Sequence, residues 1–212
     1  MQRRAAHLCR KSPESFLDTV STDPLSMSRI IEVVQYDPAW IAAFEKEAAI
    51  LKTIFGRRVV DLQHIGSTAV PGLDAKPVVD ILVVLDHTDD INSFNRAMEG
   101  AGYRVRGECL DAPVPGTPGR FYFTKETNSV RSHHVHVCAQ GHSEIFDKLA
   151  FRDYLRAHSN TAAAYGELKR RIAAEYRFDN IGYMRAKDVF VKSTLLEARR
   201  WYDTQRTTSW KR

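Results

Sequence analysis

Residues 64–85 read HIGSTAVPGLDAKPVVDILVVL, and this stretch contains the features that decide the fold. From Pro77 to Leu85 the residues are almost all apolar, which is typical of a strand buried on both faces of a sheet. Residues 58–64 form a second expected strand, and Gly66-Ser67 ends it. The two strands and the loop between them therefore predict a buried sheet with a glycine-serine turn at its edge.

Asp80 is the one charged residue inside this apolar run. An ionised carboxylate without a partner in the protein interior is strongly destabilising. Asp80 must therefore be hydrogen-bonded, ion-paired, metal-bound or at the mouth of a pocket. A purely structural ion pair with a nearby cation, such as Lys76, is the alternative to a functional role. We predict that Asp80 is a catalytic residue and a metal ligand.

The turn after the first strand has the composition of an anion-binding loop. Glycine at position 66 lets the backbone approach a ligand closely, and hydroxyl and backbone N–H groups can hold phosphate oxygens. Twelve residues separate Ser67 from Asp80, so the turn and the carboxylate lie on consecutive strands. We predict that Gly66, Ser67 and Thr68 bind a nucleotide or another anion, and that His64 is catalytic.

A further strand is expected at 133–139, and it carries His133-His134-Val135-His136. Because side chains alternate along a strand, His134 and His136 share one face, roughly 7 Å apart. Two imidazoles in this arrangement can bind a metal together, or one can contact an anion. We predict that both are metal ligands and that His134 is also catalytic.

The last third of the chain supplies candidate phosphate contacts on expected helices. Tyr165 and Lys169, like Tyr183 and Lys187, are four residues apart and share a helix face. The lysines can reach phosphate and a tyrosine can stack on a base, although a solvated helix face explains the same pattern. The predicted anion-binding cations are Lys76, Arg152, Lys169 and Lys187.

The rest of the pattern predicts an α/β (α+β) chain, with a mixed sheet flanked by helices and a helical C-terminal third. Asp37 is expected to cap a first helix, with Pro38 at its first position, and another helix follows Asp89-Asp90. The remaining expected strands are 103–108 and 120–125, and the late helices are 144–157, 161–176 and 183–202. Residues 1–27 are expected to be a flexible extension, 28–202 the domain and 203–212 a basic tail.

Composition limits the possible classes of protein. The net charge of +5 suits an anionic ligand, but much of the excess lies at the two ends, so a nucleic-acid partner is possible but not favoured. Three widely spaced cysteines form neither a disulfide framework nor a zinc motif. The sequence shows no apolar run long enough to cross a membrane, and because no apolar region follows the first basic residues, we do not expect a secretory signal. We therefore expect a cytoplasmic protein; the oligomeric state stays open.

Several separated segments resemble the signature of the GrpB family over residues 29–200. They are HIGSTAVPGL (64–73), AKPVVDIL (75–82), YDPAW (36–40), HHVHV (133–137), FRDYLR (151–156) and YGELK (165–169). The resemblance implies a nucleotidyltransferase-like fold, in which the Gly-Ser turn orients a nucleotide triphosphate and carboxylates hold a divalent metal. The usual second carboxylate is replaced by Leu82. This departure puts a two-metal site in doubt.

The expected function is therefore metal-dependent nucleotidyl or related phosphoryl-group transfer, with Mg²⁺, Mn²⁺ or Zn²⁺ as the cofactor. His134 and His136 would then supply ligands in place of the missing carboxylate. Two alternatives stay open, a module that binds a nucleotide or anion without catalysis, and a metal-dependent hydrolase. Whether the chain is an enzyme is undecided at this point.

Overall fold

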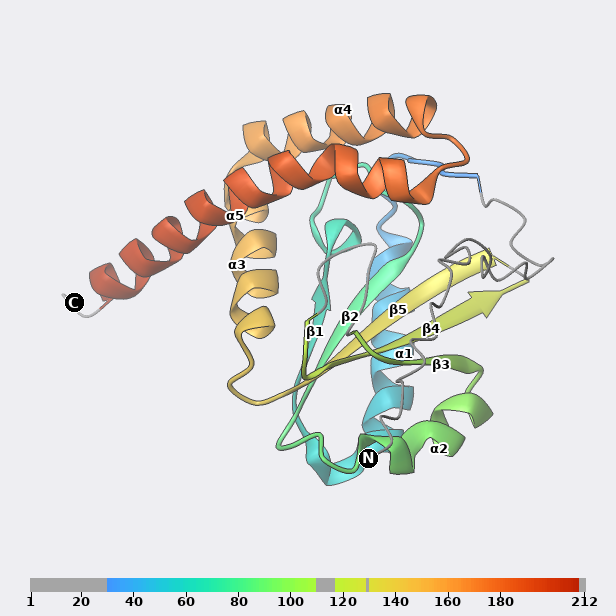
Figure 1. Cartoon of the computed structure of the whole chain (residues 1–212). Coiled ribbons are helices and arrows are strands. Elements are labelled where there is room, and N and C mark those ends of the chain that lie inside the picture. Colours follow the sequence, from blue (N-terminus) through green and yellow to red (C-terminus); the bar gives the residue numbers. More distant parts are fainter. Residues whose placement is uncertain (1–29, 110–116, 129, 210–212) are drawn as a thin grey trace, which may run out of the picture.

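The computed structural model describes residues 30–109, 117–128 and 130–209. A five-stranded mixed sheet forms its centre, in the order β1-β2-β5-β4-β3 (Figure 1). The β2–β5 pair is parallel, and the other three neighbouring pairs are antiparallel. The strands are β1 (Val59–Ile65), β2 (Val79–Leu85), β3 (Tyr103–Glu108), β4 (Arg120–Thr127) and β5 (Val130–Ala139).

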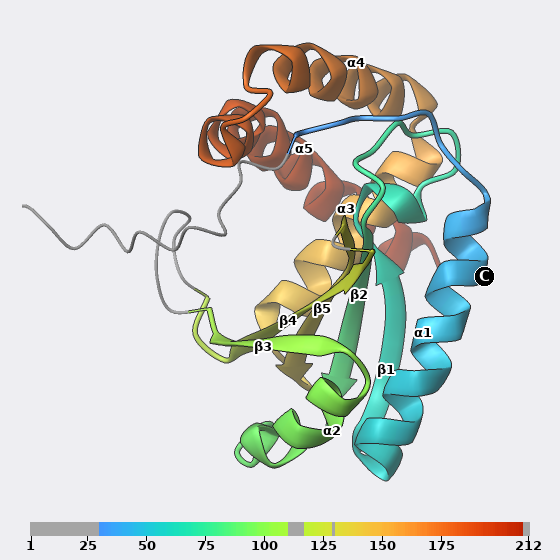
Figure 2. The ribbon, with the colours of Figure 1, turned by 90° about the vertical axis from the view of Figure 1, so that its right-hand side faces the viewer.

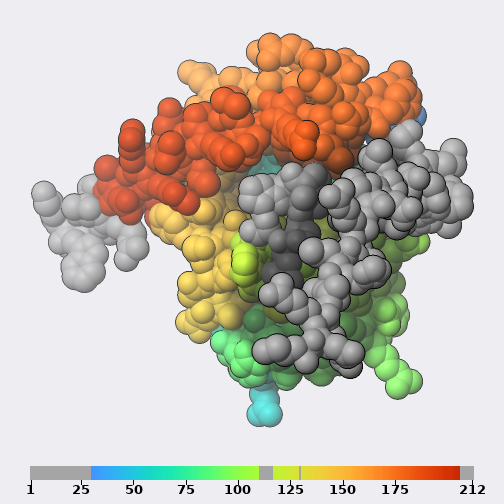
Figure 3. Space-filling model, viewed as in Figure 1, coloured from blue at the N-terminus to red at the C-terminus, as the bar shows by residue number. Residues whose placement is uncertain are grey.

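Helices cover both faces of the sheet and one of its ends. In chain order they are α1 (Ala39–Phe55), α2 (Asn95–Gly100), α3 (Ser143–Ala157), α4 (Ser159–Glu175) and α5 (Asn180–Ser209), with short 3₁₀ turns at Gly56–Arg58, Ser67–Ala69 and Ile91–Phe94. Helix α1 lies on one face and α3 on the other, while α4 and α5 cross the end at which β1 stops and β2 starts (Figure 2). The space-filling view shows α4 and α5 as a continuous bar across that end (Figure 3).

Strand alternation divides the apolar residues of β2 between two packing layers. Ile81, Val83 and Leu85 face α1 and pack with Leu51 and Phe55. The intervening residues, Leu82 and Val84, pack instead against Ile65 and Cys138, and against Ile145 and Leu149 of α3. Burial on both faces explains the near-continuous apolar run of this strand. The same alternation directs Asp80 toward the α3 side, at the end where α4 and α5 cross the sheet.

The predicted mixed sheet, flanking helices and helical C-terminal third are confirmed, with shifts at the ends of elements. Helix α1 begins at Ala39, one residue after the expected Pro38, and its N–H at Ala39 still donates to Oδ1 of Asp37 at 2.8 Å. The helix expected after Asp89-Asp90 is a 3₁₀ turn followed by α2. Helix α5 continues to Ser209, past the expected domain end at 202. Residues 1–27 lie outside the described part of the chain.

Candidate functional site

The site is built on the contact between Gly66 and Asp80. Ile65, the last residue of β1, pairs with Asp80 near the start of β2. Gly66 follows with φ of +71°, a conformation that side chains other than glycine rarely adopt. A Cβ atom on this residue would collide with Oδ2 of Asp80. Glycine at position 66 therefore allows the chain to turn directly against the carboxylate.

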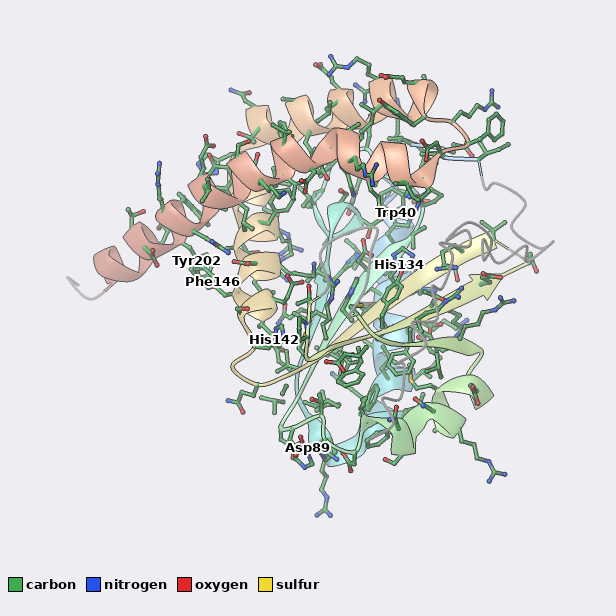
Figure 4. The ribbon with its side chains drawn as sticks, viewed as in Figure 1. Trp40, Asp89, His134, His142, Phe146 and Tyr202 are labelled. Atoms are coloured by element: carbon green, nitrogen blue, oxygen red, sulfur yellow. The ribbon has the colours of Figure 1, made fainter. Side chains whose placement is uncertain are left out.

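Parallel pairing of β2 with β5 brings the predicted histidines to Asp80. Asp80 is paired with His134, and Leu82 with His136, so all four side chains share the α3 face of the sheet. His134 Nδ1 donates to Oδ1 of Asp80 at 3.0 Å, whereas His136 Nε2 lies 3.9 Å from the same oxygen, beyond hydrogen-bonding distance. His134 lies on the sheet below α5 (Figure 4). The structure thus brings together the three predicted metal ligands.

The environment sets the ionisation of this cluster. Burial raises the pKa of the Asp80 carboxyl, but the hydrogen bond from His134 and the electrostatic influence of His134 and His136 outweigh burial and hold this pKa well below its usual range. Burial lowers the pKa of His136 to about 4, against a smaller raising effect of Asp80. The carboxylate is therefore ionised and His136 neutral at pH 7. When Nδ1 of His134 donates to Asp80, Nε2 is the ring nitrogen left to accept a hydrogen bond or bind a ligand.

Tyr122 of β4 belongs to this cluster, although sequence reasoning did not single it out. Its ring is stacked on His136, with centroids 5.1 Å apart, and its edge meets His134 at 5.4 Å. Burial and the charge of Asp80 raise the pKa of Tyr122 to about 12, so it stays protonated at neutral pH. The alternating polar residues of β4, Arg120, Tyr122 and Thr124, were the available signal, but only the pairing register shows that they adjoin the histidines.

Leu82 occupies the place where a second carboxylate would hold metal. It is fully buried and packs under α3, so it contributes no ligand. Across residues 30–109, 117–128 and 130–209, no group of three or more His, Cys, Asp or Glu side chains is arranged to hold a metal ion. Asp80 Oδ1 is instead the acceptor for His134. The protein donors fit a metal only if oxygen atoms of a ligand complete its coordination.

Ser67, at the start of the 3₁₀ turn Ser67–Ala69, meets a lysine from α4. Lys169 Nζ donates to Ser67 Oγ at 2.9 Å, and the same ammonium lies 4.4 Å from the ring centroid of Tyr165. Lys169 is 2% exposed, and burial, followed by the charge of Lys187, lowers its pKa to about 7. The prediction that Ser67 and Lys169 lie in one site is consistent with this contact.

Lys76 and Lys187 form a second cationic group around Tyr183. Their Nζ atoms lie 5.0 and 5.7 Å from the centroid of this buried ring. Lys76 also donates to Asn180 Oδ1 at 3.2 Å, rather than pairing with Asp80. Burial and the repulsion of Lys187 lower the pKa of Lys76 to about 8, against a raising effect of Asp80. Because Tyr165 and Tyr183 are buried, they support the lysines and do not offer a stacking face to a base.

Two residues predicted for the site face away from it. His64 pairs with Ile81, so its side chain lies on the α1 face, opposite Asp80, where its ring is stacked on Phe44 at 4.9 Å. Its Nε2 lies 3.0 Å from Thr68 Oγ1, and burial lowers its pKa to about 4. Thr68 is 1% exposed, so its hydroxyl is not available to a ligand. The structure therefore separates His64 and Thr68 from the cluster.

Arg152 of α3 also makes its contacts outside the cluster of Asp80 and the two histidines. Its guanidinium donates to Gln63 Oε1 at 2.8 Å and to the carbonyl oxygen of His64 at 3.0 Å, and it pairs with Asp153 at 2.7 Å. These contacts tie α3 to the end of β1 instead of presenting a free cation. Arg156, one helical turn later, similarly donates to the carbonyl oxygen of Ala69 at 2.7 Å and holds the turn in place.

Comparison with known proteins identifies the family of this chain. The family model described as GrpB protein matches residues 30–197, which includes every predicted site residue. The chain belongs to the GrpB family. The crystal structure of the conserved protein GrpB from Enterococcus faecalis is similar to it, with a TM-score of 0.73 and 37% sequence identity over 81% of this chain and 99% of that one.

Other GrpB relatives match the same region. The glutamate-rich protein GrpB of Alkalihalophilus pseudofirmus is 34% identical over 170 residues, which are 78% of this chain and 94% of that protein. The UPF0157 protein YqkA of Bacillus subtilis is 38% identical over 173 residues, 82% of this chain. The match spans 48% of YqkA, so this GrpB chain corresponds to about half of that relative. None of the described helices is long and apolar enough to cross a membrane.

Proposed function

We propose that this GrpB-family protein binds the phosphate groups of a nucleotide or another phosphorylated small molecule. The main observation behind this proposal is the pair of lysines around Tyr183, of which Lys187 also acts electrostatically on Lys169, the residue that donates to Ser67. Within the described residues, neither Lys76 nor Lys187 forms an ion pair with a carboxylate, and their repulsion contributes to the lowered pKa of Lys76. A bound anion would relieve this repulsion, which favours a phosphate ligand over a neutral one.

More specifically, we propose that the protein catalyses nucleotidyl or related phosphoryl-group transfer. Gly66 places the turn directly against the Asp80 carboxylate, and the next residue, Ser67, accepts a hydrogen bond from Lys169. Asp80 orients the ring of His134 through Nδ1, and the Nε2 atom would either accept a proton from an attacking hydroxyl group or bind a metal, but not both. The positive charges of the lysines would stabilise the negative charge that develops on the phosphate oxygens in the transition state.

The proposed transfer reaction would use a divalent metal. Asp80, His134 and His136 would hold it, with ligand phosphate oxygens completing the coordination. Such an ion would offset charge on the phosphates. Mg²⁺ and Mn²⁺ suit the oxygen donors, whereas Zn²⁺ suits the imidazoles. Metal analysis of the purified protein, with and without nucleotide, tests this part. A metal content that is unaffected by Asp80→Ala would remove it.

Calorimetric titration tests the binding proposal. Inorganic phosphate, pyrophosphate, triphosphate and the four ribonucleoside triphosphates are titrated into the wild type, K76M, K187M and a control, K192M. Lys192 is 70% exposed and pairs with Asp188 on α5, so its loss removes the same charge away from the site. We expect binding that weakens about tenfold or more in K76M and K187M only. Equal weakening in K192M would indicate a non-specific charge effect and contradict the proposal.

A non-catalytic binding module is the second candidate, and buried Leu82 favours it because one carboxylate alone supports a two-metal reaction poorly. Pyrophosphate release from each nucleotide with Mg²⁺ or Mn²⁺ distinguishes the two. Release that is lost in Asp80→Ala supports transfer, and stabilisation by ligand without product supports the module. A metal-dependent hydrolase, the third candidate, predicts zinc in the purified protein. Nucleic-acid binding, the least favoured, predicts steep salt dependence.

A further inference from the structure

Lys169 differs from the other two lysines in what its ammonium contacts. Its side chain is almost fully buried, and its Nζ is already directed at Ser67 Oγ, 2.9 Å away. The ring of Tyr165 lies beneath the same nitrogen at 4.4 Å and is stacked on Phe190, with centroids 4.9 Å apart. The lysine is therefore held on one side by an aromatic surface and on the other by a single hydroxyl.

Ser67 has the position that a nucleophile needs. It follows a strand and a glycine with positive φ, and it begins a short 3₁₀ turn that Arg156 holds through the carbonyl oxygen of Ala69. Its side chain is partly exposed, whereas Lys169 behind it is not. A serine hydroxyl is a weak nucleophile unless a base within hydrogen-bonding reach accepts its proton.

We propose that Ser67 is a nucleophile and Lys169 its general base, and that the pair acts on the phosphorus atom of a phosphate ester or anhydride. The substrate class rests on the proposed function, with phosphates held by Lys76 and Lys187. The lowered pKa of Lys169, about 7, supports the assignment because a substantial fraction of the amine is neutral at physiological pH. Tyr165 is a positioning residue for Lys169.

The step balances without a further reagent. Ser67 Oγ gives its proton to Lys169 Nζ and forms a bond to phosphorus, while the bond from phosphorus to the leaving oxygen breaks and that oxygen takes the proton from Lys169. A phosphorylated serine results. In the second half, a water or an acceptor hydroxyl gives a proton to Lys169 and attacks phosphorus, and Ser67 leaves and recovers the proton.

A fluorophosphonate probe tests the pair directly, since it carries an electrophilic phosphorus atom without a negative charge. The full chain is treated with the probe, and intact mass and peptide mapping locate the adduct. We expect one adduct at Ser67, none in S67A, and labelling at least about 100-fold slower in K169M and K169R. Arginine keeps the positive charge but cannot act as the base. S193A and K192R are the matched controls on the exposed face of α5 and should label like the wild type.

The pH dependence of the wild type gives a second readout that needs no variant. Labelling should slow about tenfold per pH unit below pH 7 and level off above it, because only the neutral amine accepts the proton. No adduct at Ser67, K169R labelling at the wild-type rate while folded, or a rate that is flat from pH 5.5 to 8 would each overturn the proposal.

Failure of this proposal is distinguishable from failure of phosphate binding. If Ser67 is labelled but triphosphate does not bind, the assignment of Ser67 as a nucleophile is supported. The phosphate substrate class and the proposed function are then both refuted. If triphosphate binds and S67A retains that binding, but Ser67 is never labelled, the binding site stands and the nucleophile is refuted. Thermal unfolding of each variant shows whether a loss of labelling reflects a loss of fold.

Discussion

Gly66 Cα lies against the Asp80 carboxylate so closely that no side chain fits between them. This contact joins the turn at Ser67–Ala69 to the end of β2 that carries Asp80. The two parts of the site are therefore closely packed, because a Cβ atom at position 66 would collide with Oδ2 of Asp80. The contact also provides a direct test of the site's architecture.

Gly66→Ala should be more destabilising than Gly72→Ala, which is its matched control. Both glycines have positive φ, +71° and +77°, but a Cβ at position 72 meets nothing within 4 Å, whereas at position 66 it collides with Asp80. We expect about 1 kcal/mol of strain in Gly72→Ala and roughly 1–3 kcal/mol more in Gly66→Ala. Urea unfolding measures both. Equal costs would mean that Asp80 is not held where the structure has it.

Asp80→Asn should strengthen the binding of inorganic triphosphate in the absence of metal. Burial lowers the pKa of Lys76 and of Lys169, and the charge of Asp80 partly opposes this lowering. The field of the carboxylate therefore reaches both lysines and also opposes an incoming anion. We expect an increase in affinity of a few-fold without metal, and the loss of any increase that Mg²⁺ or Mn²⁺ produces. Calorimetry with and without metal measures both the metal-free affinity and the effect of the metal on it. Weaker metal-free binding in the variant would show that Asp80 does not repel the ligand.

Stability should rise with pH between about 7 and 8.5. The pKa of Lys169 is lowered to about 7 in the folded protein and returns to its ordinary value of about 10.5 on unfolding, so the unfolded chain binds more protons in this window. Lys76, with a pKa of about 8, acts in the same direction. Each lysine that is neutral in the folded protein and protonated in the unfolded chain increases the free energy of unfolding by about 1.4 kcal/mol per pH unit. Urea unfolding across the window should show a smaller slope in Lys169→Met, with Lys192→Met unchanged. An unaltered slope in Lys169→Met would contradict the lowered pKa.

His64→Ala should reduce stability without weakening ligand binding. The variant removes the contact with Thr68 and the stacking on Phe44, at a cost of roughly 1–3 kcal/mol. Because the ring faces α1, triphosphate affinity should stay within about twofold of the wild type. Chemical unfolding and calorimetry on the same preparation separate the effects. A stable variant that no longer binds would return His64 to the site.

Local sequence patterns determined much of this fold. The apolar run from Pro77 to Leu85 specified a doubly buried strand, because burial on both faces leaves no polar alternation. The period of two along β5 placed His134 and His136 on one face, and glycine at position 66 marked a turn near Asp80. Each of these inferences depends on neighbours in the chain, for which side-chain direction follows from backbone geometry.

Tertiary structure alone decided which faces meet. Nothing in the sequence states that His64 pairs with Ile81 and therefore turns away from Asp80, or that Tyr122 adjoins the histidines, because pairing register is a relation between separate strands. The contact of Lys169 with Ser67 joins residues 102 positions apart. It exists because α4 packs across the end of the sheet. Periodicity gives the face of a helix, whereas packing selects the surface that this face covers.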